Sequence, residues 1–151
     1  MIEAATIDDA PEILDVINRG NRVYKKVIPK KYYRIVVISK EELLRDMKRM
    51  TFYVYRKDGK IVAVCALFIE YKDLVRLRWV YVLPEYQGMG IGKEMVRFLE
   101  GKARELNVGK LKIYTAEGAD WAIGFYQKLG YKTVGKIERV WGNDVIMENV
   151  L

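Results

Sequence analysis

Apolar and polar residues repeat along the chain with two different periods, and the change between them is sharpest near the middle. Strand-forming residues run from 74 to 83, where Val, Leu, Trp and Tyr predominate. Pro84 ends this run, because a proline has no N–H to donate to a sheet. Apolar residues then recur every three or four positions, at Ile91, Met95, Phe98, Leu99, Ala103 and Leu106. This spacing is one face of an amphipathic helix, so the segment is predicted as strand, turn and helix.

The same patterns predict elements on both sides of this segment. A short strand is expected at 2–6, followed by a helix to about residue 18 that Asp8 or Asp9 can cap. Ser39 and Glu42 have the spacing of a capping box, which begins a helix to about residue 50. Residues 19–37 show no clear period. The remaining predictions are strands 51–56 and 60–69 around the turn Asp58–Gly59, a strand at 111–115, a helix at 120–129 that Gly130 ends, and a final hairpin of 131–140 and 145–150 turning at 142–144.

The turn between the central strand and helix is rich in glycine, and it reads Gln87-Gly88-Met89-Gly90-Ile91-Gly92-Lys93. The first N–H groups of a helix lack internal partners, and glycines let an anion approach them, so this arrangement favours phosphate binding. A dinucleotide fingerprint would need glycine at 93, and a nucleoside triphosphate loop would need glycine at 87 and Ser or Thr at 94. Both fail. Gln/Arg-x-x-Gly-x-Gly/Ala is met in full, and the alternative is an ordinary turn in which the glycines only allow tight bending.

Here the sequence resembles the GNAT superfamily of acetyl-coenzyme A (acetyl-CoA)-dependent acyltransferases, whose pyrophosphate loop has this form. The lead-in Val82-Leu83-Pro84-Glu85-Tyr86 is similar to that family's, and so is the later segment Ala-x-x-Phe-Tyr-x-Lys-x-Gly-Tyr at 122–131. The order of predicted elements also matches. The resemblance therefore implies an α+β fold, with a mixed, mostly antiparallel sheet flanked by helices, and N-acetyltransferase activity. Ala119 departs from the pattern, since many members carry Asn there to contact the pantetheine arm.

The resemblance also assigns roles to particular residues. The backbones of Val80 and Val82 are expected to hydrogen-bond the pantetheine amides, with the Val80 N–H polarising the acetyl carbonyl. Tyr126 is expected to be the general acid that protonates the leaving thiolate, while the alternative is a tyrosine that only packs on a helix face. The loop residues expected to bind the cofactor are Gln87, Gly88, Met89, Gly90, Ile91, Gly92 and Lys93.

The general base stays open at the level of sequence. Arg76 and Tyr114 stand where some family members place a glutamate, and Arg76 cannot accept a proton. Glu70, Glu117 and a water relay remain, with the relay preferred. Arg76 and Arg78 share one face of the strand, and they are candidates to bind a carboxylate or phosphate of the substrate. Acceptor contacts are expected from 19–34 and from the turn at 70–74.

Composition narrows the classes of protein that fit. The 151 residues are 51% apolar and 31% charged, which predicts one folded domain over 1–151. The absence of histidine excludes Ser-His and Cys-His catalysis and any His-ligated metal, so no metal is expected. A single cysteine and the lack of a signal pattern or membrane span predict a cytoplasmic protein.

The net charge of +7 suits a phosphorylated cofactor or nucleic acid. The prediction is an enzyme that uses acetyl-CoA as cosubstrate and acetylates the primary amine of a small molecule or protein. The alternative is an acetyl-CoA sensor or an RNA-binding module on the same fold. We expect no tight nucleic-acid binding and no membrane association, and homodimer formation remains open.

Overall fold

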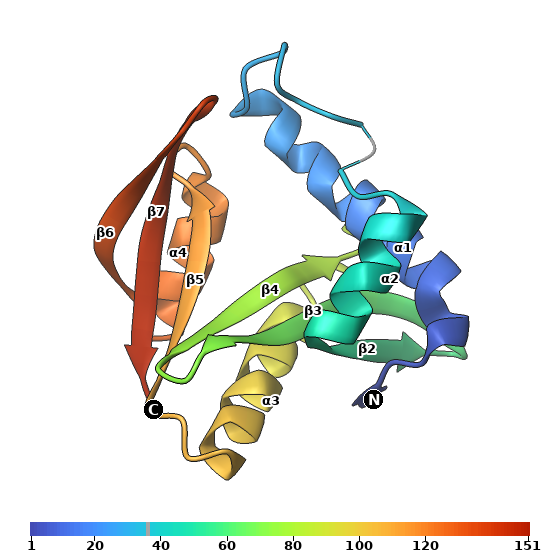
Figure 1. Cartoon of the computed structure of the whole chain (residues 1–151). Coiled ribbons are helices and arrows are strands. Elements are labelled where there is room, and N and C mark those ends of the chain that lie inside the picture. Colours follow the sequence, from blue (N-terminus) through green and yellow to red (C-terminus); the bar gives the residue numbers. More distant parts are fainter. Residues whose placement is uncertain (36) are drawn as a thin grey trace.

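One seven-stranded sheet forms the centre of the molecule (Figure 1). The computed structural model describes residues 1–35 and 37–151. The spatial order of the strands is β1-β2-β3-β4-β5-β7-β6, and every neighbouring pair is antiparallel except β4 and β5. The fold is therefore α+β with a mostly antiparallel sheet, as predicted. The strands are β1 (Ile2–Ala4), β2 (Thr51–Lys57), β3 (Lys60–Tyr71), β4 (Leu74–Val82), β5 (Lys110–Ala116), β6 (Lys132–Arg139) and β7 (Gly142–Val150).

Among the described residues, four α-helices cover the sheet: α1 (Ala10–Gly20), α2 (Lys40–Arg49), α3 (Ile91–Glu105) and α4 (Asp120–Lys128). Figure 1 shows α1 and α2 on one face of β2–β4 and α3 on the other. Short 3-10 turns lie at Ile7–Asp9, Asn21–Lys26 and Pro84–Tyr86. The apolar stripe predicted for α3 is buried at Ile91, Met95, Leu99 and Ala103 and half-buried at Phe98, whereas Leu106, expected as its last member, follows the helix and is exposed. In the described chain, no helix combines the length and the hydrophobicity that crossing a membrane would take.

Local chemistry explains where several elements begin and turn. The Ser39 hydroxyl accepts a hydrogen bond from the Glu42 N–H, and the Glu42 carboxylate accepts one from the Ser39 N–H, which confirms the capping box. Asp58 and Gly59 both have positive φ, as a tight two-residue hairpin requires, and this turn is also confirmed. At α1 the N-cap residue is Asp9, one of the two expected, but its side chain makes no capping hydrogen bond and instead accepts from the Thr6 N–H.

The final hairpin turns earlier than expected. Val140 and Trp141 form its two-residue loop, and Arg139 pairs with Gly142. The predicted turn residues Gly142, Asn143 and Asp144 therefore begin β7. Gly142 has φ of 141°, so a glycine is needed at the first residue after the turn. The prediction placed the turn too late because Gly, Asn and Asp are typical turn residues.

β4 and β5 separate soon after they meet, and this seam positions the functional site. In the part of the chain that the structure describes, they share a single residue pair, Arg76 with Lys112, and the C-terminal half of β4 has no strand partner on that side. Trp79 sits at a register shift opposite β3 and has φ of 54°, which is uncommon for a residue with a large side chain. Its indole N–H donates to Asp46 of α2 at 2.9 Å, which fixes the bulge.

Candidate active site

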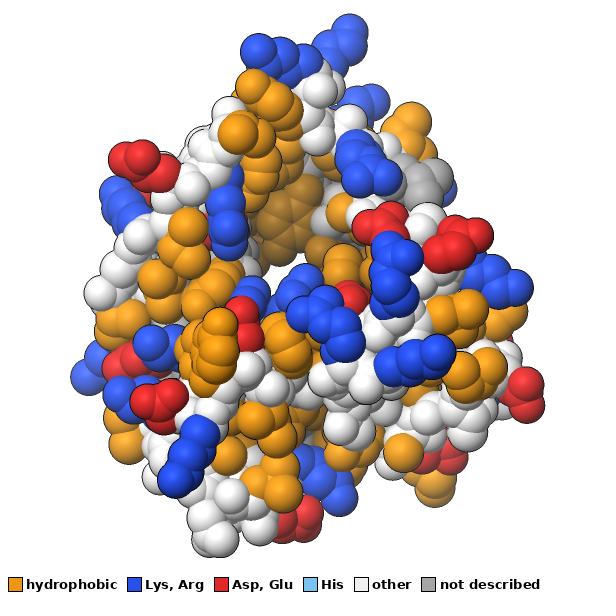
Figure 2. All heavy atoms as spheres, in the orientation of Figure 1, with side chains coloured by type: hydrophobic (Ala, Val, Ile, Leu, Met, Phe, Trp, Pro, Cys, Tyr) orange, Lys and Arg blue, Asp and Glu red, His pale blue; other side chains and the backbone are white. Residues whose placement is uncertain are grey.

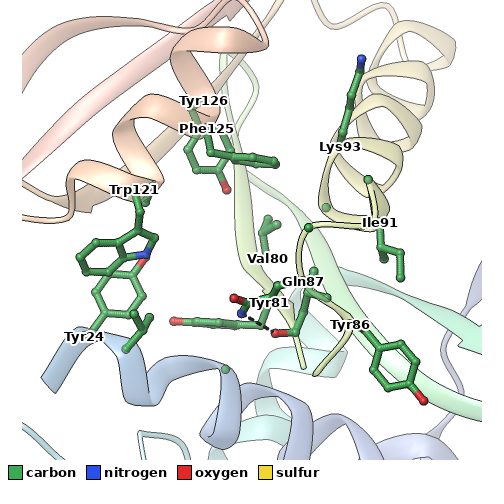
Figure 3. A pocket seen from close by; sticks show the side chains of 17 residues that line it. Tyr24, Val80, Tyr81, Tyr86, Gln87, Ile91, Lys93, Trp121, Phe125 and Tyr126 are labelled. Atoms are coloured by element: carbon green, nitrogen blue, oxygen red, sulfur yellow. Dashed lines mark hydrogen bonds between the residues drawn. The ribbon is translucent and has the colours of Figure 1, made fainter. Parts of the chain in front are cut away.

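A cavity of about 470 Å³ opens at the seam between the end of β4, the start of α3 and α4 (Figure 3). Nine of the ten residues proposed from the sequence line it: Val80, Val82, Gln87, Gly88, Gly90, Ile91, Gly92, Lys93 and Tyr126. Met89 does not, because its side chain is 57% exposed and lies outside the cavity wall. Figure 3 shows Tyr24 and Trp121 lying together on the side opposite the loop.

The loop presents a row of backbone N–H groups with no acceptor. Gly88 and Gly90 have φ of 78° and 82°, a left-handed conformation that glycine adopts without strain. The Gln87 N–H donates to the Pro84 carbonyl at 3.3 Å, and the next amide bonded within the chain is that of Glu94, which donates to the Gly90 carbonyl at 3.1 Å. The N–H groups of residues 88–93 donate to no group in the described chain. Together with the positive end of the helix dipole, they can bind an anion such as pyrophosphate.

The edge of β4 turns its own backbone groups towards the cavity. The Leu83 N–H donates to the Val62 carbonyl of β3 at 2.9 Å, so alternation along the strand turns the polar groups of Val82 away from β3. The Gln87 side-chain amide donates to the Val82 carbonyl at 3.1 Å, the contact drawn in Figure 3. Gln87 therefore acts first by tying the loop to the strand, while the seam leaves the backbone at Val80 facing open space.

Tyr126 brings a phenol hydroxyl to the same space. Its side chain is only 6% exposed and packs edge-on against Phe125 and Tyr131, with ring centroids 5.0 and 5.6 Å away. In Figure 3 the hydroxyl points into the cavity towards Val80, and it makes no hydrogen bond to the described residues. Burial, followed by nearby tyrosines, raises the pKa of Tyr126 well above its usual value, so the phenol stays protonated at neutral pH.

Two further cavities continue from the first on the other side of Tyr24 and Tyr81. One, of about 240 Å³, is lined by polar groups that include Arg76, Arg78 and Asp144. The other, of about 280 Å³, is mostly aromatic and apolar. Tyr81 is held by Asn21, whose side-chain amide donates to its hydroxyl at 2.8 Å.

The predicted acceptor segments meet different outcomes. Residues from 19–34 do line these cavities, among them Tyr24, Tyr32 and Tyr33. The turn at 70–74 does not, and Tyr71 in it is 66% exposed. β3 and β4 extend past the cavities and carry their connecting turn away from the seam, so these cavities give no support to acceptor contacts from this turn.

The two glutamates considered as bases are committed elsewhere. Glu70 accepts from Arg76 at 3.0 Å, and Glu117 pairs with Lys136, whose hydrogen bond holds the Glu117 pKa below its usual value. Neither lines any of the three cavities. Asp144 is the carboxylate that does line two of them, and its Oδ2 accepts from Arg139 at 3.1 Å. Sequence reasoning missed Asp144 because it placed this residue in a turn.

Ala119, the departure from the resemblance, sits at the N-cap of α4 and is fully buried. Its N–H donates to the Ala116 carbonyl at 3.0 Å, and it packs in a small apolar cluster with Val27 and Ile28. An asparagine would place a polar amide among these apolar groups. The alanine instead suits the contact between the start of α4 and the segment that follows α1.

Comparisons with known proteins agree with this geometry. A family model described as the Acetyltransferase (GNAT) family matches residues 18–131. An amino-acid acetyltransferase of Pseudomonas putida is 28% identical over 142 residues, which cover 93% of this chain but only 29% of that protein. An S-alkylcysteine N-acetyltransferase of Bacillus subtilis is 23% identical, covering 97% of this chain and 86% of that one.

A solved structure shares the whole architecture. The PaiA N-acetyltransferase from Thermoplasma acidophilum, in complex with coenzyme A, superimposes with a TM-score of 0.86 at 22% identity over 100% of this chain and 98% of that one. The match shows that the two proteins have the same fold. Since the family model spans well over half of the sequence, the chain belongs to the GNAT acetyltransferase family.

Proposed function

We propose that this protein moves the acetyl group of acetyl-CoA directly to the primary amine of an acceptor. One observation carries the proposal: the seam cavity collects free amides at the start of α3, the open backbone of β4 and the Tyr126 hydroxyl in one space. These features complement a pyrophosphate, an amide-containing arm and a leaving thiolate. The same cavity without Tyr126 would support binding alone.

The loop and strand would hold the cofactor. The N–H groups of residues 88–93 and the charge of Lys93 would bind the pyrophosphate, and Met89 would contribute only its backbone. The backbone of Val80 and Val82 would hydrogen-bond the pantetheine arm along the open edge of β4. The Val80 N–H would then stabilise negative charge that develops on the acetyl oxygen as the amine attacks.

Two proton transfers complete the reaction. A new N–C bond forms as the C–S bond breaks, and Tyr126 would donate its proton to the departing sulfur before regaining one from solvent. The attacking amine loses a proton, which we assign to a water relay that ends at Asp144. All three carboxylates pair with a basic residue, and Asp144 is favoured over Glu70 and Glu117 because it alone of the three faces the cavities.

The relatives indicate the type of acceptor. The Pseudomonas putida protein is named for amino acids and the Bacillus subtilis protein for an S-alkylcysteine, and in both cases the acceptor is small. The cavities next to the seam, of about 240 and 280 Å³, also suit a small molecule. We propose a small amine as the acceptor of this chain.

Two measurements on the same preparation test the proposal. Calorimetric titration should show acetyl-CoA binding, and a thiol-release assay should show turnover with members of a panel of small amines. Binding with no turnover across the panel would favour the sensor alternative over the enzyme. Absence of binding would overturn the assignment of the cavity.

A further inference from the structure

The 240 Å³ cavity is unusually rich in positive charge. Its wall includes Arg76, Arg78 and Arg139 but only one carboxylate, that of Asp144. It shares Tyr24, Val80, Tyr81 and Tyr126 with the proposed cofactor cavity, so a molecule bound here lies beside the reacting groups. The face of the molecule seen in Figure 2 is hollowed at its centre, and Lys and Arg side chains gather around the hollow.

Two of these arginines are already neutralised by acids. Arg76 donates to Glu70 at 3.0 Å, and its guanidinium lies 3.8 Å from the centre of the Tyr114 ring. Arg139 donates to Asp144 at 3.1 Å. Each ion pair fixes the position of one arginine in the cavity wall, and the net charge of each pair is close to zero. The fixed charge of the cavity is therefore concentrated on the third arginine.

Arg78 is that third arginine, and it has no acidic partner. No carboxylate of the described chain lies within 4.0 Å of its guanidinium, which instead rests 5.1 Å from the centre of the Trp79 ring. Burial, followed by the charge of Arg76, lowers the Arg78 pKa, although a guanidinium stays charged at neutral pH. In addition, the buried Nε–H of Arg76 has no acceptor among the described residues. The Arg78 guanidinium and the Arg76 Nε–H therefore lack partners beside the proposed reaction site. An anionic ligand could accept hydrogen bonds from both.

The lining of the third cavity indicates which kind of group the rest of the ligand carries. It adjoins the charged cavity through Tyr81, Tyr114, Thr115 and Asp144. Asn21 and Arg34 are its further polar members, and the rest of its wall is mainly apolar and aromatic: Ile28, Tyr32, Tyr33, Val37, Ala116 and Trp141. Apolar and aromatic surfaces of this kind favour an apolar or aromatic group.

We propose that the acceptor is a free amino acid with an apolar or aromatic side chain, whose carboxylate binds Arg78. This inference rests on the proposed function and deepens it. Arg78 and Val80 lie on either side of the Trp79 bulge of β4, and both line the 240 Å³ cavity. The long Arg78 side chain can therefore hold the carboxylate while the neighbouring amine reaches the acetyl group beside Val80. The polypeptide N-terminus, the main competing acceptor, has an uncharged peptide carbonyl in place of this carboxylate.

The test compares acids with their amides in matched variants. We would measure kcat/KM for phenylalanine, leucine and methionine, for their amides and for short peptides that begin with the same residues. The wild-type protein should prefer the free acids. In Arg78→Gln, kcat/KM for the acids should fall roughly 10- to 100-fold, mainly through KM, because a charge-assisted hydrogen bond is lost. Turnover of the amides should hardly change, so the preference should disappear.

The controls separate the two proposals. Arg45→Gln removes the same charge from an exposed position on α2 and should leave the preference intact. Arg78→Lys keeps the charge but not the planar fork, and it should restore part of the loss. If amides or peptides are acetylated as well as the acids, acetyl transfer stands and the role of Arg78 is overturned. If a phosphate-bearing amine outcompetes every carboxylate, the carboxylate assignment is overturned. If no amine is acetylated although acetyl-CoA binds, the proposed function and this inference both fail.

Discussion

Tyr126 shows how one residue position can be predicted while its chemistry cannot. The motif at 122–131 located the tyrosine, but motif spacing says nothing about where a hydroxyl points. In the structure the ring is buried between Phe125 and Tyr131 while the hydroxyl reaches two cavities. A buried ring with a hydroxyl free of partners among the described residues is the arrangement that the proposed proton donor needs.

Replacing Tyr126 by Phe should slow the reaction without loosening the cofactor. The change deletes only the hydroxyl, so kcat for a competent amine should fall roughly 10²- to 10⁴-fold. Acetyl-CoA affinity should change by less than about 1 kcal/mol, because a single phenol contact is modest. Turnover and calorimetric titration check both values. Turnover near that of the wild type, with chemistry rate-limiting, would make Tyr126 a packing residue.

Tyr131 provides the matched control. Its hydroxyl donates to the buried Glu100 carboxylate at 2.8 Å, and it lines none of the cavities at the seam. Tyr131→Phe leaves Glu100 with one donor fewer and should lower the free energy of unfolding by about 1–3 kcal/mol. It should leave kcat nearly unchanged.

The pH dependence follows from the direction of the Tyr126 shift. A general acid works only while protonated, and burial raises the pKa of this phenol above its usual value near 10. Its contribution should therefore be complete at neutral pH and lost only as pH rises through the raised value. The profile of kcat between about pH 7 and 10 should show no fall due to this group. A descending limb below pH 10 that disappears in Tyr126→Phe would contradict the shift.

At the scale of elements, the start of α3 depends on glycines with different roles. Gly90 has positive φ, so a side chain there would strain the backbone and confuse loss of binding with loss of fold. Gly92 has ordinary helical geometry, and a Cβ on it would lie 3.3 Å from Phe125 and 3.8 Å from Val82. A larger side chain at Gly92 would therefore occupy the cavity between the loop and α4.

Gly92→Leu should reduce acetyl-CoA affinity at least tenfold, or about 1.4 kcal/mol, by filling this space. Leucine favours helices, so the fold should be kept, and circular dichroism would verify it. Gly101→Leu is the control on the same helix, since a Cβ on Gly101 meets nothing within 4 Å. Equal affinity in the two variants would show that the cofactor does not occupy this cavity.

Elements were predictable where their cause is local. The capping box at Ser39, the turn at Asp58–Gly59 and the apolar stripe of α3 each depend on residues close together in the sequence, and each was confirmed. The acceptor side was not predictable in this way. Asp144 and Tyr81 meet at cavities created by the separation of β4 and β5, which is a property of the assembled sheet. The partners of Glu70 and Glu117 likewise appear only once strands pair.

At the scale of the whole molecule, the net charge of +7 raises the question of nucleic-acid binding. Many of the basic residues already have partners: Arg19 pairs with Glu85, Arg56 with Asp9 and Lys136 with Glu117. The remaining charge is expected to serve the phosphates of the cofactor and the anionic acceptor.

We therefore expect no sub-micromolar RNA or DNA complex at physiological salt. Titration of labelled RNA and duplex DNA at several salt concentrations would measure this. Electrostatic binding should weaken by about one unit of logarithmic slope for each phosphate contacted. A tight complex that persists at physiological salt would favour the RNA-binding alternative.

The separation of β4 and β5 also affects how the protein avoids pairing its strands with those of other protein chains. An unpaired strand edge usually lies at the rim of a sheet, where it can template the addition of a foreign strand. The outermost strands here are β1, which has only three residues, and β6. The open backbone beyond Arg76 instead faces inward, enclosed by Tyr24, Trp121 and Phe125. A slender ligand can reach this edge but a bulky β-strand cannot, so the protein can keep hydrogen-bonding groups open for its substrate without offering them for aggregation.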